Sequence, residues 1–355
     1  MEYYIYITKE CNLNCSYCSN MPRRKNKSNT KSLREIADFI LGDIKKEGHQ
    51  NNNVVFYGGE PLLNQKFIKD FIKKTKGNDL TYLSFTNGTM LDRIDSYLLN
   101  ELNALCVSID GEHRIHDKFR GRGTYEKIIE NMYKIRSKFK GQTIARLCFV
   151  PGSSIYSSVL SVVNWFDHVH WQIENNANKH ENLDECLNDY SRDLDLLIAF
   201  WVNHLKEGIM KNIIPFQAIT SSILFKRKCN NFRCGAGSKL MAIDTDGKCF
   251  VCDDLIGTKR FCVGDIWGGV NHGKIKEIGR NVFCRQCKII NICGGRCFRA
   301  WEEFPEKIPF YCTATNLLVN KLKKRVPEIK ELIGKGIISK KELKNPVIEF
   351  TEQIP

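Results

Sequence analysis

Apolar side chains in the first part of the chain follow two periods that alternate with each other. Short runs rich in β-branched and aromatic residues predict strands over residues 3–8, 53–57, 80–85, 104–109, 143–150 and 169–173. Apolar residues at helical spacing predict helices over residues 32–46, 65–74, 91–100, 124–139, 155–166 and 187–207. This alternation predicts an α/β fold built on a parallel sheet with right-handed crossovers.

The number of strand–helix units limits the architecture. Six units are too few to close an eight-fold barrel, so we expect an open, partial (β/α)6 barrel of the TIM type. In such barrels the chemistry lies on the loops that follow the carboxyl ends of the strands. The loops that follow the predicted strands are therefore the first places to look for functional residues.

The alternation stops after about residue 214, where cysteines and glycines become frequent. Residues 215–228 are expected to form a linker or bridging segment, and residues 241–251 a hairpin with its turn at Gly247. The predicted domains are a barrel over residues 1–214, a small cysteine-rich domain over residues 215–325 and a helical tail over residues 326–355.

Composition places the chain among globular proteins, with 42% hydrophobic and 26% charged residues in 355. No apolar run approaches the length of a membrane span, and the start of the chain lacks a charged leader with an apolar core. Sixteen cysteines then indicate metal binding in a reducing compartment rather than disulfides. We expect a cytoplasmic protein without a membrane partner.

The net charge of +14 favours acidic partners such as nucleic acid, an anionic cofactor or an acidic peptide. The densest basic runs, at residues 23–27 and 321–325, contain no interleaved aromatic residues. Both runs are typical of a solvated surface, so we do not expect a nucleic-acid partner.

Three cysteines, Cys11, Cys15 and Cys18, follow the first predicted strand with the spacing C-x3-C-x2-C. Soft thiolates on one short loop favour zinc or an iron–sulfur cluster. Three ligands leave one iron of a four-iron cube without a protein ligand, whereas a closed structural zinc site needs a fourth ligand from elsewhere. Both readings follow from the spacing alone.

With Tyr17 before its last cysteine, this run resembles the signature of radical S-adenosylmethionine (SAM) enzymes. The resemblance implies a [4Fe-4S] cluster whose open iron binds SAM, which is cleaved reductively to a 5′-deoxyadenosyl radical. It also implies an anaerobic setting and an electron donor such as flavodoxin or ferredoxin. The cofactor carries the difficult chemistry, and the protein supplies binding and orientation.

Gly58, Gly59, Glu60 and Pro61 follow the second predicted strand. Two glycines allow close approach of the backbone to a ligand, and the carboxylate can pair with an ammonium group. Alone, the run is also compatible with an ordinary strand-to-helix turn. The resemblance to the radical SAM family implies that it binds the amino group of SAM.

Two further strand ends carry polar residues, Asn87 after the third strand and Ser108 at the end of the fourth. Either could be ordinary turn chemistry. The resemblance implies that Asn87 and Ser108 lie at the cofactor, with Ser108 on the ribose, and that Arg120 binds the SAM carboxylate through its planar fork. His113 and His116 are expected to be loop or capping residues.

A second series of cysteines, with Gly247 between its first two members, resembles the SPASM domain. Its members are Cys234, Cys252, Cys284, Cys287, Cys293, Cys297 and Cys312. With one further cysteine upstream they make eight, and eight cysteines could bind two tetrahedral zinc ions equally well. The residues alone therefore leave zinc binding open. The resemblance implies two closed auxiliary [4Fe-4S] clusters that transfer electrons.

The resemblance also implies how these ligands divide. One cluster would take Cys284, Cys287, Cys293 and Cys312. The other would take Cys234, Cys252, Cys297 and one upstream cysteine, for which Cys229 is the candidate and Cys249 its rival.

Asp253 directly follows Cys252. Similarity to anaerobic sulfatase-maturing enzymes implies that this carboxylate accepts a proton during substrate oxidation. The alternative is an exposed turn acid, like its neighbour Asp254.

These features together predict a radical SAM/SPASM enzyme that modifies a peptide or protein side chain. It would be similar to maturases of ribosomally made peptides and to sulfatase-maturing enzymes. Because the first strand begins near residue 3, we expect no amino-terminal leader-binding domain. Two alternatives remain: a radical SAM enzyme acting on a small molecule or RNA, and a non-catalytic zinc or redox-sensing protein.

Overall fold

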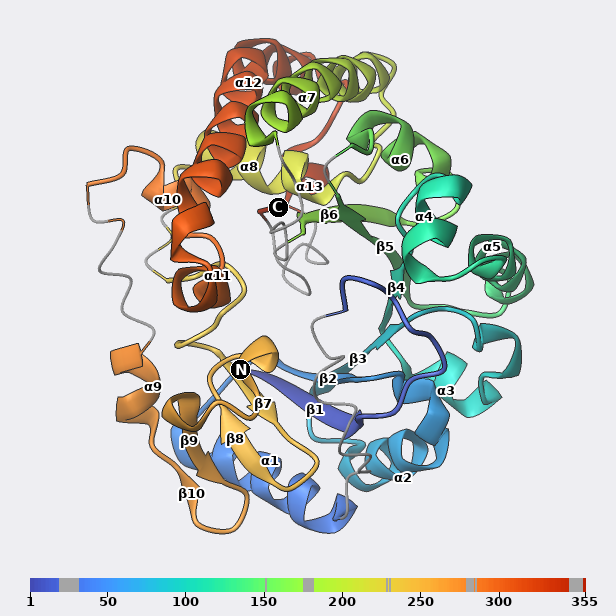
Figure 1. Cartoon of the computed structure of the whole chain (residues 1–355), viewed down its shortest axis with the longest axis vertical. Helices are drawn as coiled ribbons and strands as arrows, with labels where there is room; N and C mark the ends of the chain where they lie inside the picture. The colour runs from blue at the N-terminus through green and yellow to red at the C-terminus, as the bar shows by residue number, and fades with distance from the viewer. Residues whose placement is uncertain are drawn as a thin grey trace. The chain divides into compact units, whose positions relative to one another are not determined.

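A computed structural model describes most of the chain. The described residues are 1–18, 32–150, 152–174, 182–227, 229, 231–278, 284, 286–344 and 354–355. The predicted basic run at residues 23–27 lies outside them. The chain forms two compact units (Figure 1), each made of segments that are separate in sequence. Unit 1 contains Met1–Ser108, His116–Thr143 and Gly235–Arg280, and unit 2 contains Ile109–Ile115, Ile144–Cys234 and Asn281–Pro355.

Unit 1 is built on parallel strands that follow one another in the chain. They are β1 (Glu2–Thr8), β2 (Asn52–Gly58), β3 (Leu80–Thr86) and β4 (Ala104–Ser108). Beyond β1, the sheet continues with β7 (Leu240–Ile243), β8 (Lys248–Phe250), β9 (Cys262–Asp265) and β10 (Gly269–Val270). β7 pairs with β1 in parallel, and the later strands are antiparallel.

The hairpin predicted over residues 241–251 is confirmed as β7 and β8. Its turn contains Gly247 at a φ of +86°, a left-handed conformation that favours glycine. A Cβ at Gly247 would also lie 2.7 Å from the ring of Trp267. Both constraints explain why glycine occupies this turn.

Helices of unit 1 follow the predicted periodicity closely. They are α1 (Leu33–Glu47), α2 (Gln65–Thr75), α3 (Ser96–Glu101) and α5 (Thr124–Ile135), with α9 (His272–Ile278) and short 3-10 turns at Pro61–Asn64, Asp253–Leu255 and Lys259–Phe261. Helices α1 and α2 pack side by side along the outer face of the first strands (Figure 1). The Ser32 side chain accepts a hydrogen bond from the Glu35 amide and caps α1, as is usual at helix amino termini.

One predicted helix of this unit, over residues 91–100, is wrong in extent. The chain forms a 3-10 turn at Leu91–Arg93, becomes extended at Ile94 and starts α3 afterwards. The Asp95 side chain accepts a hydrogen bond from the Tyr97 amide and caps α3. A local capping side chain therefore outweighs the continuous apolar spacing.

Strand β1 is buried along its whole length, and its side chains alternate between two faces. Tyr3 lies on the face covered by α1, where its hydroxyl donates to Asp43. The opposite, inner face carries an aromatic cluster made of Tyr4, Tyr6, Tyr57 and Phe85. No sequence motif marks this aromatic cluster.

Unit 2 combines two parallel strands with long helices. The strands are β5 (Gln142–Phe149) and β6 (His168–Ile173), and β5 begins just before the unit does. The helices of this unit include α6 (Ile155–Val162), α7 (Leu183–Lys206), α8 (Ile214–Leu224), α10 (Ile290–Cys293), α11 (Phe298–Glu303), α12 (Ile308–Gly334) and α13 (Lys340–Leu343). A 3-10 turn lies at Pro305–Lys307. Helix α4 (His113–Arg120) belongs partly to each unit. Helix α12 packs against α7 and α8.

The predicted linker over residues 215–228 is wrong, because most of it is helix α8. Every residue of α8 from Ile214 to Ser222 is buried. A helix buried on all sides needs no polar face, so its sequence lacks the amphipathic period that identifies a helix. Pro215 lies in the first turn, where its missing amide hydrogen costs nothing.

The predicted strands are all present, each within one residue of its predicted bounds. The α/β fold is confirmed. The domain boundaries after residues 214 and 325 stay predictions, although α12 runs through residue 325 without interruption. Among the described helices, none is long and apolar enough to cross a membrane.

Candidate active site

The loop that carries Cys11, Cys15 and Cys18 begins where β1 ends, in unit 1. It is held by backbone hydrogen bonds: the Ser16 amide donates to the Phe119 carbonyl at 2.9 Å, and the Cys18 amide to the Cys15 carbonyl at 3.2 Å. Cys15 is buried, and the other two cysteines are half-buried. The loop is therefore ordered and at the carboxyl end of the strand, as predicted.

The sulfur of Cys11 accepts two hydrogen bonds. The Leu13 amide nitrogen lies 3.4 Å and the Asn87 side-chain nitrogen 3.7 Å from it. Donors aimed at a sulfur stabilise the thiolate form that ligates metals, and they tune the potential of iron–sulfur clusters. These surroundings fit a cluster ligand better than a thiol in an apolar core.

Asn87 connects the loop after β3 to the cysteine loop. Its Nδ2 donates to Asn12 Oδ1 at 2.8 Å, and its Oδ1 accepts from the Thr89 amide at 3.0 Å. The predicted cofactor-binding residue Asn87 thus lies against the predicted cluster ligand Cys11. The sequence placed both residues at strand ends without showing that they touch.

Gly58 and Gly59 let two backbone segments approach closely. A Cβ would lie 2.4 Å from the Thr8 carbonyl oxygen at Gly58, whose φ is +129°, and 1.9 Å from the Glu10 carbonyl oxygen at Gly59. The amides of Gly59 and Glu60 each donate to this segment at 2.8 Å. The two glycines thus let the loop after β2 lie directly against the start of the cysteine loop, and their contact with a ligand stays a prediction.

Glu60 is fully buried and accepts three hydrogen bonds. Its donors are the Leu62 amide at 3.1 Å, the Thr86 hydroxyl at 2.8 Å and the Asn87 amide at 2.7 Å. Burial raises the pKa of Glu60 to about 7, although the three donors act in the opposite direction. The carboxyl group joins the ends of β2 and β3, with Pro61 starting the turn behind it.

Tyr17 packs between two residues near the end of α4. The Arg120 guanidinium lies 5.3 Å from the Tyr17 ring centroid, and the Phe119 ring lies 5.7 Å from it. A cation over an aromatic face is attracted electrostatically. Arg120 therefore lies beside the cysteine loop, while Ser108 ends β4 as predicted.

His116 contacts Thr124 at the start of α5, with 3.0 Å between Nε2 and the hydroxyl oxygen. It is completely buried. The expectation that His113 and His116 are loop or capping residues is wrong, because both lie in α4, and α5 starts after Gly123 without a side-chain cap.

Asp253 lies beside the inner aromatic cluster. The Tyr6 hydroxyl donates to its backbone carbonyl at 3.0 Å, and the Cys252 sulfur lies 3.8 Å from its carboxylate. Burial, and then the charges of Asp253 and Asp254, raise the pKa of Tyr57 well above its ordinary value. Asp253 therefore lies beside Tyr6 of β1 and Tyr57 of β2, a contact between residues far apart in the chain that no sequence pattern indicates.

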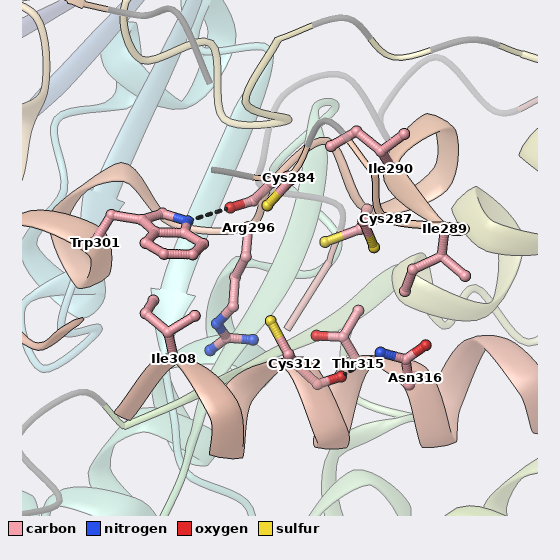
Figure 2. Close-up of a pocket in the computed structure, with 12 residues that line it drawn as sticks. Cys284, Cys287, Ile289, Ile290, Arg296, Trp301, Ile308, Cys312, Thr315 and Asn316 are labelled. Carbon is pink, nitrogen blue, oxygen red and sulfur yellow. Dashed lines mark hydrogen bonds between the residues drawn. The ribbon is translucent and has the colours of Figure 1, made fainter. Parts of the chain in front are cut away.

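Unit 2 holds a pocket lined by Cys284, Cys287, Cys293 and Cys312 (Figure 2). Burial raises the pKa of Cys293 to about 11 and also raises that of Cys312, where the charges of Cys284 and Cys287 add to the effect. Four thiols this close cannot all ionise without a compensating cation. The donor set fits a closed four-thiolate metal or cluster site.

Arg296 lines the same pocket and was missed by the sequence analysis. It is buried, its φ is +62°, and its guanidinium stacks 4.4 Å from the Tyr311 ring centroid. Its positive charge lowers the pKa of both Cys293 and Cys312. No sequence signal distinguished this arginine, because only the fold turns it toward the sulfurs.

The two candidates for the remaining auxiliary ligand lie in different surroundings. A Cβ at Gly294 would lie 2.8 Å from the Cys229 sulfur, so Cys229 packs against the segment between Cys293 and Cys297, in unit 2. Cys249 is completely buried in β8, and the nearby charges that raise its pKa, after burial, include Cys262 and Asp43. It therefore lies on the α1 side of the sheet, away from Tyr6 and Asp253.

Cys252 belongs to unit 1, whereas Cys234 and Cys297 belong to unit 2. Their assignment to one cluster stays a prediction.

The family model of the radical SAM superfamily matches residues 5–155. The chain therefore contains a radical SAM domain and is an enzyme of the radical SAM class. The cofactors of this family are a [4Fe-4S] cluster and SAM, and the three-cysteine loop supplies suitable donors.

Similar proteins extend beyond that domain. The cysteine-type anaerobic sulfatase-maturating enzyme of Clostridium novyi (strain NT) is 25% identical over 84% of this chain and 88% of its own. The radical SAM cyclopropyl synthase TigE of Paramaledivibacter caminithermalis is 23% identical, over 92% of this chain and 74% of its own. The structure of anSMEcpe with bound AdoMet and Kp18Cys peptide has a TM-score of 0.74 at 18% identity and covers 93% of this chain and 99% of its own. This last likeness confirms the fold.

Proposed function

We propose that this enzyme modifies a side chain of a peptide or protein substrate by radical SAM chemistry. The observation that carries the proposal is that similarity to a sulfatase-maturating enzyme covers 84% of the chain, well beyond the radical SAM domain. The four-cysteine pocket of unit 2 belongs to the part beyond that domain. By its name one similar protein matures a sulfatase, and by its title one similar structure contains a bound Kp18Cys peptide.

Cys11, Cys15 and Cys18 are the proposed ligands of the first [4Fe-4S] cluster, which with SAM supplies a 5′-deoxyadenosyl radical when bound. The Leu13 amide and the Asn87 side chain donate to the Cys11 sulfur and stabilise its thiolate. The Ser16 and Cys18 amides fix the loop that carries all three ligands.

Glu60, Ser108 and Arg120 are the proposed SAM contacts of unit 1. Glu60 accepts three hydrogen bonds, and a carboxylate has room for a fourth donor such as an ammonium group. Because its pKa is about 7, an arriving cation would draw it into the charged form. Arg120, stacked on Tyr17, offers a planar fork for the SAM carboxylate.

Cys284, Cys287, Cys293 and Cys312 are the proposed ligands of one auxiliary cluster, with Arg296 offsetting its negative charge. The second set is Cys234, Cys252, Cys297 and Cys229. Cys229 is preferred to Cys249, because Cys249 lies on the α1 side of the sheet. Closed clusters of this kind serve electron transfer, and a flavodoxin or ferredoxin is the proposed electron donor.

Asp253 is the proposed proton acceptor during substrate oxidation. The Tyr6 hydroxyl holds its backbone, so the carboxylate keeps its place beside the inner aromatic cluster. A general base can act only if it lies within hydrogen-bond reach of the proton that it takes up, so its position is the first requirement.

The decisive experiment replaces Cys11, Cys15 and Cys18 together by alanine. Anaerobically reconstituted wild type, given SAM and a reductant, should release 5′-deoxyadenosine, and the triple variant should release none, because no cluster remains to hold SAM. Undiminished cleavage by the variant would refute the assignment of these ligands. Mass change in peptides, compared with nucleotides and RNA as substrates, separates the proposed substrate class from the small-molecule and RNA alternatives.

A further inference from the structure

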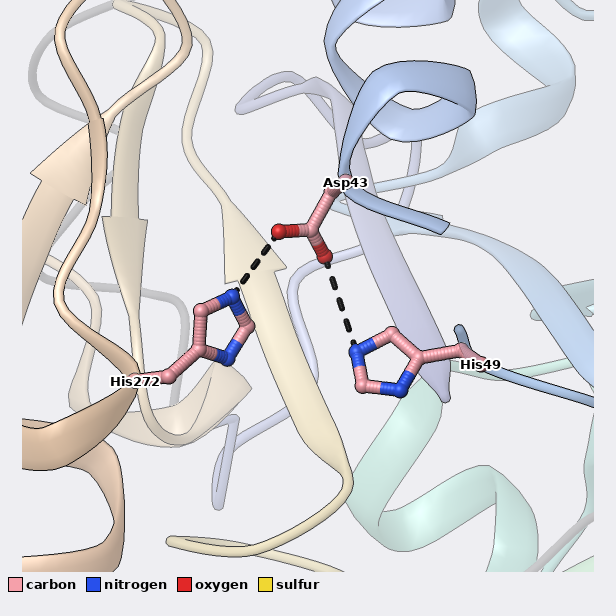
Figure 3. Close-up of side chains that lie close together, drawn as sticks. All are labelled: Asp43, His49 and His272. Carbon is pink, nitrogen blue, oxygen red and sulfur yellow. Dashed lines mark hydrogen bonds and ion pairs between the residues drawn. The ribbon is translucent and has the colours of Figure 1, made fainter. Parts of the chain in front are cut away.

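Another group of metal-ligating side chains lies in unit 1, apart from the cysteine loop after β1 and from the four-cysteine pocket of unit 2. It consists of Asp43, His49 and His272 (Figure 3). One donor atom from each lies within 4.8 Å of the others. The His272 Nε2 is 2.9 Å from one carboxylate oxygen of Asp43, and the His49 Nε2 is 3.9 Å from the other. Both imidazole rings therefore turn a nitrogen toward the same carboxylate.

Two segments that are distant in sequence bring these side chains together. Asp43 lies near the end of α1, and His49 follows the left-handed Gly48 that ends this helix. His272 is the first residue of α9 and is separated from the end of β10 by Asn271. The group thus joins the amino-terminal helix to the last strand of the β7–β10 segment, 229 residues apart in sequence.

Hydrogen bonds behind the group fix its members. The Tyr3 hydroxyl, completely buried in β1, donates to Asp43 Oδ2 at 2.7 Å. The Asn52 side chain donates to the His49 carbonyl at 3.0 Å. Outer partners of this kind orient metal ligands and raise their affinity.

The nitrogen of His49 that faces Asp43 is buried, and no described residue supplies it with a hydrogen bond. A buried polar atom without a partner costs free energy, so such an atom calls for an explanation. A cation between the three groups would satisfy this nitrogen.

We propose that Asp43, His49 and His272 bind one Zn²⁺ ion. Two imidazole nitrogens and a carboxylate oxygen are common zinc ligands, with bonds of about 2.0–2.2 Å. Tetrahedral geometry then separates ligand atoms by about 3.3 Å. The observed distances to the Asp43 carboxylate, 2.9 Å from His272 Nε2 to Oδ1 and 3.9 Å from His49 Nε2 to Oδ2, lie on either side of that value. Glu47, whose carboxylate is 3.9 Å from His272 Nε2, or a water molecule completes the four ligands.

The ion fastens the β7–β10 segment, which includes the turn that carries Asp253, to α1. This role does not depend on the substrate or on the auxiliary clusters.

Metal analysis of the reconstituted holoenzyme tests the site. The protein, loaded with iron and sulfide, is treated with a mild chelator, incubated with Zn²⁺ and desalted. Wild type should retain one zinc per chain, and zinc K-edge absorption should show nitrogen and oxygen neighbours at about 2.0–2.1 Å without sulfur at about 2.3 Å. The His49→Gln/His272→Gln variant should keep its iron and lose zinc at least about tenfold, since even outer partners are worth that much.

His204→Gln is the matched control, because His204 lies in α7 of unit 2 and contacts Phe200, one helical turn earlier, through its carbonyl and its ring. It should retain zinc as wild type does. Wild type without zinc, zinc with sulfur neighbours, or zinc retained by the double variant would each overturn the proposal. If the double variant loses its iron as well, the single His272→Gln change, at a partly exposed side chain, replaces it under the same criteria.

Discussion

At the scale of single residues, Glu60 shows how a motif acquires a meaning from its surroundings. Its sequence position suggested a carboxylate open to a ligand, yet it is fully buried and bonded to the end of β3. Burial raises its pKa to about 7 from an ordinary value of 4.5. Between these values the folded chain holds a proton that the unfolded chain has released.

Stability should therefore fall as pH rises through this window. The expected slope is about 1.4 kcal/mol per pH unit for a single proton. The side chain of Glu60→Gln cannot ionise, so the variant lacks this contribution to the pH dependence. The unfolding free energy of wild type minus that of the variant should therefore fall from pH 5 to pH 7. The measurement is denaturant unfolding without SAM, whose ammonium group would favour the charged form.

Glu130→Gln, at an exposed glutamate of α5, is the control and should keep the wild-type slope. Parallel pH profiles for wild type and Glu60→Gln would show that Glu60 is ionised throughout.

Asp253 allows a second prediction at this scale. Asp253→Asn should still cleave SAM but form modified peptide about 100-fold more slowly or worse, since a general base contributes about 10²–10⁴. The Kp18Cys peptide of the structural neighbour is the first substrate to try. Product mass and 5′-deoxyadenosine yield are measured together.

Asp254→Asn serves as the internal comparison, because it changes the adjacent acid in the same turn. It should behave as wild type. Full product from Asp253→Asn would mean that the proton goes elsewhere and that the reaction differs from that of the sulfatase-maturing enzymes.

At the scale of elements, the close packing of the loop after β2 against the cysteine loop has a testable consequence. In Gly59→Ala the new Cβ would lie 1.9 Å from the Glu10 carbonyl oxygen, so one backbone segment must move. Because Cys11 follows Glu10, we expect loss of 5′-deoxyadenosine formation and a lower thermal midpoint. Overpacking typically costs about 1–3 kcal/mol.

Gly42→Ala is the matched substitution, since nothing lies within 4 Å of its Cβ and Gly42 is inside α1. It should raise stability by up to about 1 kcal/mol through helix propensity and leave cleavage unchanged. Equal effects of the two alanines would argue against the steric explanation.

At the scale of the whole molecule, metal content is the main prediction. If the chain holds three [4Fe-4S] clusters, it should contain about twelve irons. The variant lacking Cys11, Cys15 and Cys18 should contain about eight. Iron and sulfide analysis after anaerobic reconstitution measures both. Two zinc ions with sulfur ligands, and iron only at the first loop, would instead support structural zinc in the cysteine-rich region.

The sequence by itself determined the strand–helix alternation and the local motifs. Cysteine spacing, the glycine pair before Glu60 and the turn at Gly247 depend on residues within a few positions of one another. Backbone sterics and ligand spacing act over such distances, so a linear pattern can carry them.

Tertiary structure alone decided which distant groups meet. It buried α8, turned Arg296 toward the four cysteines, set Asp253 beside Tyr6 and brought His272 to Asp43. Such contacts are fixed by the packing of whole helices and strands. The same packing can arise with many different numbers of residues between the contacting positions, so the sequence spacing does not reveal the contact. The chemistry of single residues could therefore be predicted from the sequence, whereas the residues that they contact are known only from the fold.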